Sequence, residues 1–170
     1  MAGLTPTAPL AAPEALREDH DTDGFDSGEP TLDIWLARRA RANPSGASRT
    51  YVVCRERKVV GYHALASGGI DLDAAPGRLR RNMPDPLPVV VLGRLAIARA
   101  EQGRGLGHAL LRDASLRVLQ AAQRVGVALL VVHALSERAK QFYLDCGYKE
   151  SPLDPMTLMT RVKDLSDALE

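Results

Sequence analysis

The sequence predicts an α/β protein with a mixed β-sheet, and two patterns support that fold class. Apolar segments at residues 51–54 and 59–66, joined by a charged turn, predict an antiparallel β-hairpin. An apolar strand at 89–97, a glycine-rich turn, a long amphipathic helix and a second apolar strand at 127–132 predict a β–α–β unit. Strands joined through such a helix are generally parallel, so both kinds of strand pairing are expected.

The first helix is expected before the hairpin. Thr31 is the expected N-cap, and the apolar side chains that follow (Leu32, Trp35 and Leu36) fall on one helical face. The Asn-Pro-Ser-Gly stretch at residues 43–46 is expected to end this helix.

A loop is expected at residues 67–88. It carries three arginines and then prolines at alternate positions: Arg78, Arg80, Arg81, Pro84, Pro86 and Pro88. Proline fixes φ and lacks the N–H that a strand ladder needs. A stiff, extended approach to the following strand is therefore predicted.

The strongest helical pattern follows the glycine turn. Apolar residues recur at steps of three and four from Leu106 to Val125, and Gly126 is expected to end this helix. Ser136 is expected to cap a further helix, which Gly147 terminates. Residues 156–162 are predicted to form a weak last strand.

The chain length of 170 residues fits one domain. We expect a flexible leader at residues 1–13, the domain at 14–165 and a polar tail at 166–170. No apolar run approaches the roughly 20 residues that a membrane-spanning helix needs, and the leader has neither the basic nor the apolar region of a signal peptide. A cytoplasmic protein with no membrane attachment is therefore expected.

The cysteines and histidines give no sign of a metal site. Cys54 and Cys146 lack metal-ligand spacing, so we expect free thiols, an inert buried one at Cys54, and no bound metal. His63 and His133 lie in or beside apolar strands. A structural role is favoured for both histidines over that of a general base.

The net charge of +1 conceals an uneven distribution. Residues 14–29 carry seven acidic groups and one arginine, whereas 38–41, 55–58 and 78–81 are basic clusters. Such clusters permit a positive surface that contacts phosphates, although solvated surface charge explains each cluster equally well when it is taken singly.

A glycine-rich turn between the buried strand and the longest helix is the clearest functional signal; it reads Gln102-Gly103-Arg104-Gly105-Leu106-Gly107. Glycines let a ligand approach the backbone, and the first N–H groups of a helix are unpaired and partly positive. Such a turn suits a pyrophosphate. The spacing fits neither a Walker A motif nor the nicotinamide-dinucleotide fingerprint. A capping loop without any ligand is the alternative interpretation.

The surroundings of the turn sharpen this interpretation. The pattern is Gln102-x-x-Gly105-x-Gly107, preceded by Leu95-Ala96-Ile97 and followed, after the next strand, by Ala139-x-x-Phe142-Tyr143-x-x-x-Gly147-Tyr148. Together these segments resemble the acyl-CoA site of the GNAT family of N-acetyltransferases. The resemblance implies the GNAT fold, a mixed and mostly antiparallel central sheet flanked by helices, with acetyl-CoA as the acetyl donor.

The resemblance also implies roles for individual residues. Tyr143 is expected to protonate the leaving thiolate as a general acid, with a core tyrosine as the alternative. Acetyl-CoA contacts are implied for Leu95, Ala96, Ile97, Gln102, Gly103, Arg104, Gly105, Leu106, Gly107, Ser136, Ala139 and Phe142. No Asp or Glu stands out as a general base, so a water, or an amine of low pKa that needs no base, is expected to suffice.

Further segments widen the resemblance to about residues 10–165. They include Leu32-Asp33-x-Trp35-Leu36, residues 80–86, Leu92-Gly93-Arg94-Leu95-Ala96 and residues 151–158. They resemble the acetyltransferase toxins of bacterial type II toxin–antitoxin pairs, of the TacT and AtaT kind, which acetylate the α-amine of aminoacyl-tRNA and block translation. One departure is Ser27, where that branch often has Cys.

The toxin resemblance implies charged tRNA as the acceptor, a ribbon-helix-helix antitoxin and a homodimer. Because tRNA is recognised through phosphates and shape, the expected contacts are Arg38, Arg41, Arg78, Arg81, Asn82 and Arg94. The lowered pKa of the α-amine in an aminoacyl ester agrees with the lack of an evident base. The alternatives are an acetyltransferase for a small amine or a protein N-terminus, and a non-catalytic co-repressor that binds acetyl-CoA.

Overall fold

The computed structural model describes residues 8–42 and 46–168. The chain divides into two compact units. The first contains the residues up to Ala64 together with Arg94–Leu111, and the second contains Leu65–Gly93 and the residues from Arg112 onward. Over the described part of the chain, no helix combines the length and apolar character needed to cross a membrane.

A seven-stranded sheet is formed by the described residues, in the order β1-β2-β3-β4-β5-β7-β6. Its strands are β1 (Glu14–Ala15), β2 (Arg49–Arg55), β3 (Lys58–Ile70), β4 (Leu87–Ile97), β5 (Leu129–His133), β6 (Lys149–Glu150) and β7 (Thr157–Arg161). β4 and β5 are parallel, whereas β1 pairs with β2, β5 with β7 and β6 with β7 in the antiparallel sense. The predicted mixed sheet and its β–α–β unit are confirmed.

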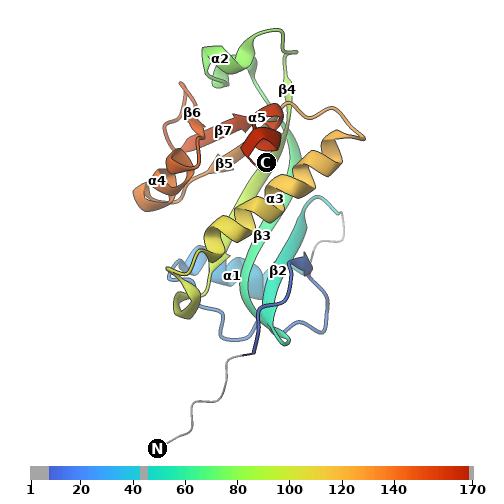
Figure 1. The fold of residues 1–170 in the computed structure, drawn as a ribbon, viewed down its shortest axis with the longest axis vertical. Coiled ribbons are helices and arrows are strands. Elements are labelled where there is room, and N and C mark those ends of the chain that lie inside the picture. The colour runs from blue at the N-terminus through green and yellow to red at the C-terminus, as the bar shows by residue number, and fades with distance from the viewer. Residues whose placement is uncertain (1–7, 43–45, 169–170) are drawn as a thin grey trace, which may run out of the picture. The chain divides into compact units, whose positions relative to one another are not determined.

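The helical elements connect these strands or, at the end of the chain, follow the last one (Figure 1). They are α1 (Pro30–Arg38), α2 (Gly77–Arg80), α3 (Leu106–Ala122), α4 (Glu137–Asp145) and α5 (Val162–Ala168), with short 3₁₀ turns at Leu72–Ala74 and Arg99–Glu101. α3 is the connection between the parallel strands β4 and β5, as the sequence predicted.

The first unit buries apolar side chains on both faces of its strands. On one face α1 contributes Leu32 and Leu36 to a cluster that includes Tyr62, whose hydroxyl donates to the Leu32 carbonyl (2.6 Å). On the other face the start of α3 packs through Leu110. A Cβ at Gly61 would lie 3.1 Å from Leu110 Cδ1, so a glycine in β3 permits this close approach of the helix.

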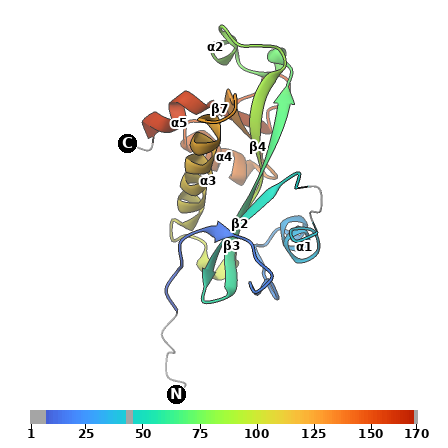
Figure 2. The same cartoon turned by 90° about the vertical axis from the view of Figure 1, so that its right-hand side faces the viewer.

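The second unit has its own apolar cluster. Leu129 and Val131 of β5 and Met159 of β7 pack there with Leu79 of α2. The ends of β3 and β4 that flank the connection containing α2 (residues 71–86, the α2 segment) run side by side in Figures 1 and 2. This segment therefore covers one face of β5 and β7.

Several predicted boundaries were wrong. The N-cap of α1 is Glu29 and not Thr31, because Pro30 takes the first helical position, where its fixed φ and missing N–H are tolerated. The loop expected at 67–88 is shorter, since β3 continues to Ile70 and β4 begins at Leu87. α3 ends at Ala122, and Val125 adds only a turn through its N–H to Ala121.

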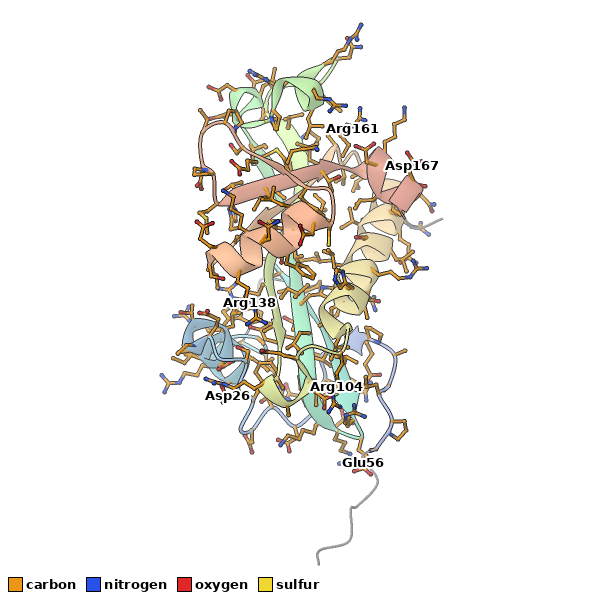
Figure 3. The ribbon with its side chains drawn as sticks, turned by 60° about the vertical axis from the view of Figure 1, so that its left-hand side comes forward. Asp26, Glu56, Arg104, Arg138, Arg161 and Asp167 are labelled. Atoms are coloured by element: carbon orange, nitrogen blue, oxygen red, sulfur yellow. The ribbon has the colours of Figure 1, made fainter. Side chains whose placement is uncertain are left out.

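The chain ends also differ from the expectations. Residues 1–7 of the expected leader lie outside the described residues, but Leu10 forms an antiparallel bridge to Arg55. Most of the expected polar tail belongs to α5, which buries Leu165 and carries the Arg161–Asp164 ion pair (2.9 Å). β1 and β6 were not predicted, because two-residue strands leave no periodic pattern. Figure 3 labels Arg161, which immediately precedes α5, and Asp167 in that helix.

Candidate active site

The glycine turn has the backbone shape that its sequence requires. Gly103 and Gly105 have φ values of +80° and +84°, which side chains with a Cβ rarely adopt. A Cβ built on either glycine would meet no heavy atom within 4 Å, so the space beside both is open. Leu106 is buried and starts α3, while Arg104 is exposed on the loop before that helix (Figure 3). Open space beside helix N–H groups is what a bound phosphate needs.

Gln102 is exposed and holds the turn through its side-chain amide. Its side-chain amide donates to the carbonyls of Ile97 (2.9 Å) and Ser27 (2.8 Å). Ser27 is itself fixed, because its hydroxyl donates to Asp33 Oδ1 (2.6 Å). The Gln102 amide nitrogen thus donates to protein carbonyls. Gln102 supports a ligand only indirectly, because it fixes the position of the turn and of its backbone.

A partly buried ion pair holds the residue before the turn. Glu101 is only 7% exposed and accepts from Arg55 Nε (3.0 Å) and Nη2 (2.8 Å), with Arg104 Nη1 at 3.6 Å. The hydrogen bonds from Arg55 lower the pKa of Glu101. Sequence reasoning missed this pair because 46 positions separate its members and no spacing rule connects them.

The end of β4 can offer a ligand only its backbone. Ala96 belongs to the cluster under α1, whereas Leu95 and Ile97 pack against the cluster at the start of α3. All three side chains are therefore used in packing on opposite faces of the strand.

The predicted cap of α4 is confirmed. Ser136 is the N-cap, and its side chain accepts from the Ala139 N–H (3.1 Å). Tyr143 lies on this helix and is 7% exposed, with its ring centroid 5.2 Å from that of Phe142 and 5.5 Å from that of Tyr148. Burial raises the pKa of Tyr143 well above its ordinary value. The phenol is thus protonated at neutral pH, as a proton donor must be.

Two of the predicted tRNA contacts have roles inside the protein. The Arg41 guanidinium donates to the Arg17 carbonyl (3.3 Å) and also to that of His20, which ties down the chain before α1. The Arg94 guanidinium lies 4.4 Å from the centre of the Trp35 ring, a cation–π contact. Partial burial lowers the pKa of Arg94.

The other predicted tRNA contacts are exposed. Arg38 lies at the end of α1, and Arg78, Arg81 and Asn82 lie in and after α2. Asn82 has a positive φ of 59°, which turns the chain after α2. The exposed basic side chains of the α2 segment are free to face a polyanion.

The remaining candidate groups divide into buried and exposed ones. His63 is fully buried, with its ring centroid 5.2 Å from that of Tyr51. Cys54 is buried as expected, and burial raises its pKa to about 11. His133 is exposed, and its Nδ1 lies 2.9 Å from Thr157 Oγ1. No cluster of three or more potential metal ligands occurs in residues 8–42 and 46–168.

Comparison with known proteins identifies the family. Residues 46–150 match the acetyltransferase (GNAT) domain, and the chain belongs to this family of acetyltransferases. Within it, the chain is 51% identical over 155 residues to the tRNA-acetylating toxin of Mycobacterium tuberculosis, covering 91% of this chain and 93% of that protein.

Two solved structures agree with this relationship. AtaT complexed with acetyl-methionyl-tRNAfMet has a TM-score of 0.87 at 32% identity, covering 95% of this chain and all of that one. A mutant of the toxin AtaT bound to the C-terminus of the antitoxin AtaR and acetyl-CoA has a TM-score of 0.78 at 32% identity, covering 92% and 96%. The GNAT fold expected from the sequence is confirmed.

Proposed function

We propose that this protein is a toxin that transfers the acetyl group of acetyl-CoA to the α-amine of aminoacyl-tRNA and so blocks translation. The observation that carries the proposal is the 51% identity to a tRNA-acetylating toxin over nine-tenths of both chains. Residues 14–165 are proposed to be the acetyltransferase domain. The acceptor implies action in the cytoplasm, where charged tRNA is used.

The glycine turn is the proposed pyrophosphate site. Gly103 and Gly105 leave open space beside them, and the unpaired N–H groups that begin α3 favour an anion at this end of the helix. The backbone of Leu95, Ala96 and Ile97 is proposed to bind the pantetheine arm. Ala139 and Phe142 are proposed contacts on α4, where the Ser136 oxygen is used for capping.

Acetyl-CoA supplies an acyl group on a thiol leaving group. The residues of this chain then have two tasks, to position the acceptor amine and to protonate the departing sulfur. Tyr143 is the proposed proton donor, supported by its place on α4 and by a phenol that is protonated at neutral pH.

The exposed basic side chains are the proposed tRNA contacts. Arg38, Arg78 and Arg81, with Asn82, are accessible to a phosphate backbone. Arg41 and Arg94 are proposed to act mainly by shaping the protein, because their guanidinium groups already contact the chain before α1 and Trp35. AtaT, which is bound to acetyl-methionyl-tRNA in its structure, supports tRNA as the acceptor.

The protein is also proposed to form a homodimer and to be neutralised by a ribbon-helix-helix antitoxin. A mutant AtaT bound to the C-terminus of the antitoxin AtaR supports an antitoxin as a partner. Light scattering of the purified protein tests the dimer, since a monomer at micromolar concentration would contradict it.

A cell-free translation assay tests the proposed function. The protein and acetyl-CoA together are expected to stop protein synthesis, whereas either alone has little effect. Charged tRNA that is added after acetyl-CoA has been removed should restore synthesis, and Tyr143→Phe should inhibit far less. Translation that continues while free amino acids or protein N-termini become acetylated would favour the alternative acceptor. Inhibition without any acetyl transfer would favour a non-catalytic protein.

A further inference from the structure

The segment between β6 and β7 forms a hydrogen-bonded structure that the donor site does not explain. Asp154 accepts from the Met156 N–H (3.0 Å) through one carboxylate oxygen and from the Thr157 hydroxyl (2.8 Å) through the other. Ser151 at the start of the segment donates to the Ala74 carbonyl (2.6 Å), which joins it to the chain before α2. These bonds fix the position of the Thr157 side chain.

Thr157 in turn orients His133. The Met156 N–H and the Thr157 hydroxyl lower the pKa of Asp154, so this carboxylate is ionised at neutral pH and can only accept hydrogen bonds. Thr157 donates its single hydroxyl proton to Asp154. The Thr157 oxygen can therefore only accept from His133 Nδ1, 2.9 Å away. The neutral ring then carries its proton on Nδ1, which leaves a lone pair on Nε2.

His133 also occupies an informative position in the sheet. It is the last residue of β5, directly opposite Thr157 of β7, and its ring is exposed. Side chains two positions apart share a face of a strand, so His133 lies on the face of Leu129 and Val131. That face is covered by the α2 segment. His133 therefore shares a sheet face with the segment that carries the proposed tRNA contacts Arg78 and Arg81.

We propose that His133 is a catalytic residue that accepts a proton from the acceptor amine through Nε2, and that Thr157 and Asp154 are its positioning residues. This inference rests on the proposed function and adds a proton acceptor to it. Asp154 interacts electrostatically with His133, and Lys140 of α4, itself paired with Glu150 (2.9 Å), interacts with Asp154.

The proton balance of the step is complete. The amine nitrogen forms a bond to the thioester carbonyl carbon, and the carbon–sulfur bond breaks with its electron pair on sulfur. One amine proton passes to Nε2 of His133, and sulfur takes the hydroxyl proton of Tyr143. The exposed imidazolium then releases its proton to water, and the phenolate regains one from water. The products are the N-acetylated aminoacyl ester and the free thiol of coenzyme A.

The test measures initial rates of acetylation of charged tRNA by the full-length protein, from mildly acidic to mildly alkaline pH. His133→Gln is expected to lower kcat/KM by about 10²-fold, the typical contribution of a positioned acid or base. Acetyl-CoA binding, measured by calorimetry, should remain as in the wild type and also reports that the variant is folded.

The positioning role has a matched pair of variants. Thr157 and Thr160 lie on the same strand and are both 9% exposed, but they lie on opposite faces. Thr157→Val should lower kcat and Thr157→Ser should restore it, whereas Thr160→Val should leave it unchanged. If both valine variants behave alike, the positioning role is wrong.

The proton-accepting role has a clear contrary result. His133→Gln with the wild-type rate would overturn it, even if the wild type acetylates charged tRNA. A wild-type protein that does not acetylate charged tRNA would instead refute the proposed function. If His133→Gln does not fold, the Thr157→Val and Thr157→Ser pair still decides the proposal.

Discussion

Replacement of Gly105 by alanine tests the proposed pyrophosphate site. Gly105 has a φ of +84°, and a left-handed conformation costs a residue with a Cβ roughly 1–2 kcal/mol. The turn is held by the hydrogen bonds of Gln102 and the Arg55–Glu101 pair, so the free protein should keep its shape and bear this cost. For a domain of this size, the melting temperature should fall by about 2–8 °C.

The added methyl group should also weaken the binding of acetyl-CoA. It meets no protein atom within 4 Å, so it occupies the space that the pyrophosphate is proposed to fill. A loss of 1–2 kcal/mol, on the scale of the conformational cost, corresponds to about a five- to thirtyfold weaker Kd. If the free protein instead relaxes the turn, it avoids this conformational cost. Acetyl-CoA must then restore the bound shape of the turn and bear the cost, so the affinity still falls.

Calorimetric titration with acetyl-CoA and thermal unfolding provide the assay. Gly126→Ala is the matched control, because Gly126 also has no neighbour within 4 Å of a Cβ but has no positive φ. This control should bind acetyl-CoA normally and be at least as stable as the wild type. A Gly105→Ala protein that melts lower yet binds acetyl-CoA as tightly as the wild type would refute the assignment of this turn.

Three further predictions concern catalysis, tRNA binding and pH. Tyr143→Phe keeps its ring contacts and should lower kcat by about 10²-fold or more, whereas Tyr148→Phe should not; equal rates for the two variants would exclude the acid role. Arg81→Ala should reduce the salt dependence of tRNA binding by roughly 0.7–0.9 in the logarithmic slope, unlike the exposed control Arg124→Ala; identical slopes would remove Arg81 from the interface. Because pairing lowers the folded-state pKa of Glu101, its stabilising contribution is present above the unfolded value of 4.5 and is lost as pH falls through the folded value. Acid unfolding of Glu101→Gln should therefore depend less steeply on pH, and a slope as steep as that of the wild type would contradict the argument.

Local patterns in the sequence were sufficient for most of the fold. The spacing of apolar residues after the glycine turn predicted α3, and the Ser136 side chain predicted the start of α4 because a cap is set by neighbouring residues. Proline at the first helical position outweighed Thr31 as the cap signal. Strands of two residues, such as β1, form through their partners and leave no pattern of their own.

The candidate site likewise combines residues that the sequence predicted with contacts that only the structure shows. The turn and Tyr143 could be found because each belongs to a contiguous motif. The Arg55–Glu101 pair and the His133–Thr157 contact join residues 46 and 24 positions apart, so only the folded chain reveals them. Likewise, both Arg81 and Arg41 are exposed, and nothing in the sequence reveals that the Arg41 guanidinium donates to backbone carbonyls of this chain.

Mass spectrometry of total aminoacyl-tRNA after a short pulse of expression tests the central claim most directly. The account predicts that at least one aminoacyl-tRNA gains an acetyl group on its α-amine within the pulse, and that cells expressing Tyr143→Phe show little of this product. Growth arrest with every aminoacyl-tRNA left unacetylated would contradict the proposed function.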